Sequence, residues 1–95
     1  MFKHIVCMDF KADCKDKLPE AVDKFYELEK KLDIIKTCQV GLDELHADRS
    51  YDLILIIDFE SREDWAIYNT HPEHVKVKKF IHENREKSVS VDFTY

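Results

Sequence analysis

A chain of 95 residues with 44% apolar and 37% charged residues suits one small globular domain and excludes a disordered segment. A single glycine argues against a glycine-rich phosphate-binding loop, and a net charge of −5 with interleaved basic and acidic residues argues against a nucleic-acid surface. The three cysteines share no CxxC spacing and the longest apolar run, 53–57, has five residues, so we expect a cytoplasmic protein without a disulfide framework, structural zinc or membrane span.

The first third of the chain predicts a strand followed by an amphipathic helix. Residues 2–10 are rich in β-branched and aromatic types, with apolar side chains on both faces of the predicted strand. A polar connection, 11–17, leads to Pro19 in the first turn of a helix, a position that needs no amide hydrogen. The apolar stripe of this helix consists of Leu18, Val22, Phe25, Leu28 and Leu32.

The rest of the chain predicts two strands, two helical segments and a last strand. The strands lie within 33–45 and at 51–59, and Ser61 begins a helical segment that Pro72 ends or bends. A further helix over 74–85 precedes an alternating strand over 88–95. The order β-α-β-β-α-β predicts a ferredoxin-like α+β fold with an antiparallel sheet and helices on one face, in a single domain over 1–95.

Two of the predicted strands, 2–10 and 51–59, are apolar on both sides. An antiparallel sheet covered by helices on one face leaves its other face in water unless a second layer covers it. The chain has no spare elements for that layer, so we expect a homodimer that pairs through the sheet faces. Each Leu, Ile or Phe buried there would contribute roughly 1.5–3 kcal/mol.

The segment from Tyr68 to Val75 places a phenol and two imidazoles close together around Pro72. His74 and Tyr68 are candidates for an acid/base pair, because an imidazole exchanges a proton near neutral pH and a phenol can donate a hydrogen bond to an enolate oxygen. In the structural alternative, His74 bonds backbone groups of its own turn and Tyr68 fills the core. The acid/base chemistry needs no cofactor, and the sequence contains no cofactor motif.

With these residues in place, the chain resembles the stress-responsive dimeric α/β-barrel (Dabb) domains over essentially its whole length. The matching stretches are Lys3-His4-Ile5-Val6, Tyr51-Asp52-Leu53 running to Phe59-Glu60-Ser61, Tyr68-(x2)-His71-Pro72-Glu73-His74-Val75, and Val91-Asp92-Phe93. The resemblance implies a ferredoxin-like subunit whose dimer forms a β-barrel with the helices outside.

Some plant members of this family are cofactor-independent polyketide cyclases, and the resemblance implies roles for residues that match theirs. The resemblance implies that His74 is the general base, that Tyr68 assists it, and that His4 lines the same cavity. Where the cyclases carry a further histidine on the third strand, this chain has Leu53.

The remaining candidates have both structural and functional interpretations. His71 could contact a ligand or, with Pro72, simply end the helix. A metal pair from His71 and His74 would need a third ligand such as His4 or Glu73, and we assign no metal. Trp65 could lie over a ligand or anchor its helix on the sheet.

The sequence therefore predicts a homodimer that binds a small hydrophobic or carbonyl compound between sheet and helices, with possible cyclase- or isomerase-like chemistry. The predicted site consists of His74 and Tyr68 as catalytic residues and His4, Trp65 and His71 as ligand-binding residues. A non-catalytic stress-response or assembly protein is one alternative. The other is a cofactor-independent monooxygenase of the related dimeric barrel superfamily.

Overall fold

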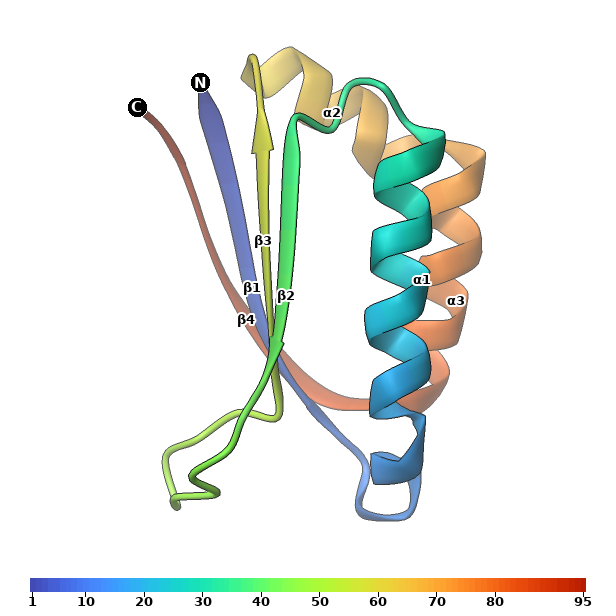
Figure 1. The fold of residues 1–95 in the computed structure, drawn as a ribbon, viewed down its shortest axis with the longest axis vertical. Coiled ribbons are helices and arrows are strands. Elements are labelled where there is room, and N and C mark those ends of the chain that lie inside the picture. Colours follow the sequence, from blue (N-terminus) through green and yellow to red (C-terminus); the bar gives the residue numbers. More distant parts are fainter.

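The computed structural model describes residues 1–95 and has the predicted order of strands and helices (Figure 1). The elements are β1 (Phe2–Phe10), the 3-10 helix η1 (Ala12–Lys17), α1 (Leu18–Lys31), β2 (Thr37–Leu42), β3 (Leu53–Phe59), α2 (Arg62–Thr70), α3 (Pro72–Asn84) and β4 (Arg85–Thr94). Neighbouring strands are antiparallel, in the order β2-β3-β1-β4. The prediction of a ferredoxin-like α+β fold is confirmed.

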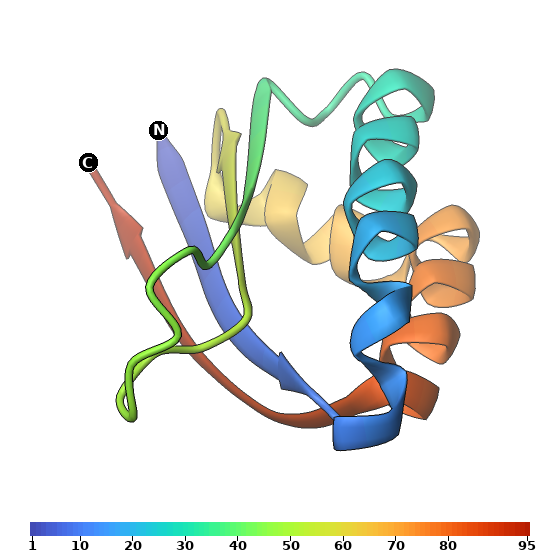
Figure 2. The same cartoon turned by 60° about the horizontal axis from the view of Figure 1, so that its bottom comes forward.

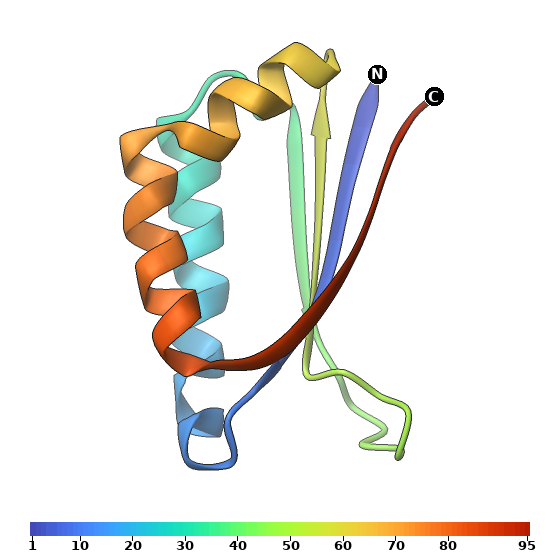
Figure 3. The same cartoon turned by 180° about the vertical axis from the view of Figure 1, so that it is seen from behind.

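All helices lie on one side of the sheet, which we call its inner face (Figures 1 and 2). The even-numbered residues of β1 and the odd-numbered residues of β3 point to this face, with Val6 opposite Leu55 in the strand register. They meet the apolar stripe of α1 in a core of 15 buried residues. Figure 3 shows from behind that α2 crosses one end of this layer, while α1 and α3 run along the sheet.

The opposite side, the outer face, is apolar and has no layer over it. We define it by the side chains that alternate with the inner-face residues: Ile5 and Cys7 of β1, Ile54 and Ile56 of β3, and Val89, Val91 and Phe93 of β4. Four of these, Ile54, Val89, Val91 and Phe93, are exposed, and Val91 reaches 64%. Isolated apolar residues are common on surfaces, but a continuous patch of this kind marks an interaction site.

Some element boundaries differ from the sequence prediction for local reasons. α3 begins at Pro72 instead of residue 74, because the Nδ1 atom of His71 accepts the Glu73 N–H at 3.1 Å and caps the helix. β4 begins at Arg85 instead of residue 88, with an irregular register at Asp9 and Phe10. The connection after β1 contains the helical turn η1, which the polar composition of 11–17 did not indicate.

No helix of the chain is both long enough and apolar enough to cross a membrane.

Candidate functional site

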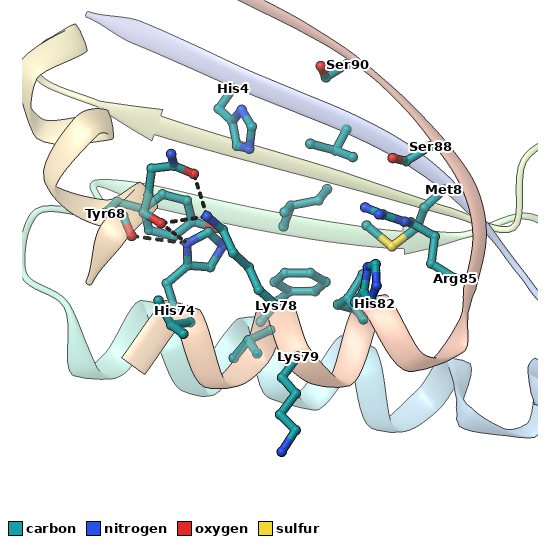
Figure 4. Close-up of a pocket in the computed structure, with 17 residues that line it drawn as sticks. His4, Met8, Tyr68, His74, Lys78, Lys79, His82, Arg85, Ser88 and Ser90 are labelled. Atoms are coloured by element: carbon teal, nitrogen blue, oxygen red, sulfur yellow. Dashed lines mark hydrogen bonds between the residues drawn. The ribbon is translucent and has the colours of Figure 1, made fainter. Parts of the chain in front are cut away.

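A pocket of about 560 Å³ lies between the inner face of β1 and β4 and one side of α3. Its floor is apolar, with Val6 and Leu55 from the sheet and Val77 from the helix. Figure 4 shows His4, Tyr68 and His74 toward one end of the pocket, and Met8, His82, Arg85 and Ser88 toward the other. The structure therefore brings three of the five predicted site residues together.

His74 is held in the first turn of α3 by the carbonyl groups that end α2. Its Nδ1 atom lies 3.1 Å from the Tyr68 carbonyl oxygen and 3.3 Å from that of Asn69. Carbonyl oxygens only accept hydrogen bonds, so Nδ1 carries the hydrogen and the neutral ring keeps its lone pair on Nε2. The two carbonyl contacts thus fix the tautomer of His74, which lines the pocket.

Burial lowers the pKa of His74 from 6.5 to about 4, and the nearby Lys78 ammonium adds to the effect. The two carbonyl contacts act in the opposite direction and only partly offset it. Lys78 is itself held by Asn69, whose carbonyl oxygen lies 2.7 Å and whose side-chain oxygen 2.9 Å from the ammonium nitrogen. At neutral pH His74 is therefore an uncharged base with a free Nε2.

Tyr68 packs between the two imidazoles of the site. Its ring stacks on His74 with centroids 3.9 Å apart and meets the edge of His4 at 6.2 Å. The residue is 0% exposed, and its hydroxyl has no hydrogen-bond partner. Burial raises the pKa of Tyr68 well above its ordinary value, so the hydroxyl remains a donor. A buried hydroxyl without a hydrogen-bond partner is rare, and this one is free to donate to an acceptor atom of a ligand.

His4 forms an ion-pair contact with Asp92 across the β1–β4 ladder, through Nδ1 and the carboxylate. The carboxylate, which only accepts hydrogen bonds, fixes Nδ1 as the protonated nitrogen. Sequence reasoning missed Asp92, although the strand alternates polar Ser88, Ser90 and Asp92 with an apolar set. That alternation was the available signal for a polar inner face.

Trp65 and His71 do not line the pocket. The centroid of the Trp65 ring lies 6.1 Å from those of both Phe2 and His4, and its Nε1–H is buried without a partner. His71 caps α3, which is its structural interpretation. The chain contains no group of three or more His, Cys, Asp or Glu side chains that could hold a metal ion.

The lining of the pocket is basic, which was not predicted, and Arg85 is the cation at the end away from His74 (Figure 4). Lys78, Lys79 and Arg85 line the pocket, together with three histidines, and no Asp or Glu does. This local excess of basic over acidic side chains contrasts with the chain's net charge of −5. Arg85 follows α3 directly, at the position where the chain turns into β4.

Comparison with known proteins agrees with the fold described above. The family model for the stress responsive A/B barrel domain matches residues 2–95, while no curated protein matches the chain. A dimeric protein of unknown function with a ferredoxin-like fold from Bacteroides fragilis is 26% identical, with a TM-score of 0.86 over 99% of this chain and 95% of its own.

Two enzymes share the fold at lower identity. A hydroxynitrile lyase from Passiflora edulis is 18% identical, with a TM-score of 0.84 over 97% of this chain and 90% of its own. An antibiotic biosynthesis monooxygenase is 14% identical, with a TM-score of 0.75 over 100% of this chain and 98% of its own. The match to the family model spans nearly every residue, and the chain belongs to the stress responsive A/B barrel domain (Dabb) family.

Proposed function

We propose that the chain is a single-domain, cytoplasmic homodimer that binds a small hydrophobic or carbonyl compound in the pocket and transfers a proton without a cofactor. The observation that carries this proposal is the pairing of His74 with Tyr68. An imidazole whose Nδ1–H is tied to two carbonyls keeps Nε2 free, and it stacks on a phenol whose hydroxyl lacks an acceptor.

The reaction this pair supports is removal of a proton next to a carbonyl group. Nε2 of His74 takes the proton, while the Tyr68 hydroxyl donates a hydrogen bond to the enolate oxygen that forms. A base with a pKa of about 4 is weak, so stabilisation of the enolate has to supply much of the acceleration. Return of the proton to another carbon gives an isomerase, and attack of the enolate on a second carbonyl gives a cyclase.

The outer face supports the dimer part of the proposal. It is a continuous apolar patch on β1, β3 and β4, and the chain has no layer to cover it. A second copy supplies an identical patch, as a two-fold interface requires. The Bacteroides fragilis relative is described as dimeric. The three free thiols fit a reducing compartment.

The non-catalytic alternative has one observation in its favour. The His74 contacts with Tyr68 and Asn69 also tie the end of α2 to the start of α3, which is a structural role. In that case the dimer itself is the functional unit of a stress-response or assembly protein. No residue of the site specifically favours the monooxygenase alternative, and its support is the shared fold.

Exchange of the α-hydrogens of phenylacetone in D₂O, followed by proton NMR, tests the proposal. The wild-type protein should accelerate exchange, His74→Gln should reduce it to the uncatalysed rate, and Tyr68→Phe should slow it by about a hundredfold, the effect of losing one oxyanion donor. His46→Asn, which removes an exposed imidazole at a positive φ that asparagine tolerates, is the control.

The variants also separate the alternatives. A folded His74→Gln protein that exchanges as fast as the wild type excludes His74 as the base. If the variant unfolds and no protein accelerates exchange, the structural role accounts for the His74 contacts in the turn. Oxygen consumption with a quinol would instead favour the monooxygenase.

A further inference from the structure

Arg85 has the setting of a ligand-binding residue at the end of the pocket away from His74. It is half-buried, lines the pocket, and forms no ion pair and no side-chain hydrogen bond in the chain. Its planar guanidinium presents several donors suited to a carboxylate. Figure 4 shows it extending toward Met8 and Ser88, between α3 and β4.

The other cations of the pocket are not equivalent to Arg85. The Lys78 ammonium is already bound by the carbonyl and side-chain oxygens of Asn69. Lys79 points away from the cavity (Figure 4). Asp92, a carboxylate of β4, bonds His4 and is not part of the lining. One unneutralised cation in a pocket with an apolar floor suits one negative charge better than the double charge of a phosphate monoester.

The distance between the two ends sets the shape of the ligand. His4 and Met8 are four residues apart on β1, or about 13 Å. His74 and Arg85 are eleven residues apart along α3 and its end, or about 16 Å. The apolar floor of the pocket, formed by Val6, Leu55 and Val77, lies between the two ends. A ligand that uses both ends is therefore elongated, apolar in the middle and acidic at one tip.

We propose that the pocket takes an amphipathic monocarboxylic acid whose carboxylate pairs with Arg85 and whose body lies along the apolar floor toward His74. The Ser88 hydroxyl, three residues after Arg85 on the same strand and also in the pocket lining, supplies a second donor to the carboxylate. This inference names the ligand class for the proposed function and rests on it for the reacting end near His74. The part of the inference that concerns the carboxylate depends on Arg85 and not on the proposed reaction.

Isothermal titration of the homodimer with decanoate, and with decan-2-one as a neutral probe, tests the inference. Arg85→Gln should weaken decanoate binding by at least about tenfold, the effect of losing a charge-assisted hydrogen bond. It should change decan-2-one binding by less than about twofold. Arg62→Gln, which removes an exposed arginine outside the pocket lining, should leave decanoate binding within about twofold of the wild type.

Two further measurements keep the test independent of folding. Arg85→Lys keeps the charge but loses the fork-shaped donor set, so its affinity for decanoate should fall between those of wild type and Arg85→Gln. For the wild type alone, added sodium chloride should weaken decanoate binding and leave decan-2-one binding unchanged.

The outcomes distinguish this inference from the proposed function. Absence of decanoate binding, or decanoate binding that Arg85→Gln leaves unchanged, overturns the inference. If decan-2-one still binds and His74→Gln abolishes that binding, the proposed function survives such a result. Conversely, decanoate binding through Arg85 without any α-hydrogen exchange keeps the inference and removes the catalytic proposal.

Discussion

The folded protein should lose stability as the pH falls below the ordinary pKa of histidine, and His74 should account for a defined part of that loss. Its pKa is about 4 in the folded state and about 6.5 in the unfolded chain. Between these values the unfolded chain binds a proton that the folded chain does not. The stabilising contribution is therefore complete above about pH 6.5 and is lost as the pH falls through about 4.

The size of the effect follows from the two pKa values. Their separation of about 2.5 corresponds to about 3 kcal/mol at 1.36 kcal/mol for each pH unit. The His74 residue is 7% exposed, so water screens it little. We therefore expect on the order of 2–3 kcal/mol of the free energy of unfolding to disappear across this range.

Urea unfolding followed by Trp65 fluorescence, at a fixed protomer concentration and at several values between about pH 7 and pH 4, measures this loss. His74→Gln should flatten the pH dependence by the amount given above. His46→Asn removes an exposed imidazole, so its free energy of unfolding should change with pH almost as that of the wild type does. Carboxylates that titrate in the same range are common to all three proteins and cancel.

An equal pH dependence in wild type and His74→Gln would refute the reasoning. It would mean that the His74 ring is hydrated enough in the folded state to accept a proton near its ordinary pKa. The neutral base with a free Nε2, on which the proposed function depends, would then be absent below neutral pH.

Three further predictions follow from the contacts of single residues. Tyr68→Phe removes a hydroxyl without a partner, so the free energy of unfolding of the ligand-free protein, measured in urea, should stay constant or rise by up to about 1 kcal/mol; a loss above about 2 kcal/mol would reveal a hidden partner. Val91→Asp places a charge on the outer face and should give monomers in sedimentation velocity, whereas Ile67→Asp, at an exposed apolar residue of α2, should leave the dimer intact. Ser61→Ala removes the oxygen that accepts the Asp64 N–H at 3.2 Å and should lower the midpoint of urea unfolding, corresponding to about 1 kcal/mol.

The fold was predictable because its signals are local and periodic. The alternation in β1 and β3 identified strands with two apolar faces, and the stripe of α1 identified the helix that covers one of them. The ends of the helices and strands were harder to predict from the sequence. The start of α3 depends on the His71 side chain accepting a hydrogen bond, a contact that spacing alone could not separate from ligand binding.

The site was predictable only where its residues are neighbours in sequence. Tyr68 and His74 belong to one motif, and the structure joins them directly. Asp92 lies 88 residues from His4, so its contact depends on the strand order and register of the whole sheet. Arg85 was assigned to a helix end, and nothing local marks it as a lining residue without an acidic partner.

Strand β4 explains why a pocket exists at this position. Its inner face carries Ser88 and Ser90 in the pocket lining, and these side chains are too small to fill the space beside α3 with apolar packing. Its outer face carries Val89, Val91 and Phe93, which lie exposed in the single chain. Because alternate residues of a strand point to opposite faces, β4 can contribute both to the ligand pocket and to the proposed dimer interface. Substitutions at its even positions should therefore alter ligand binding while the dimer persists, and those at its odd positions should alter assembly first.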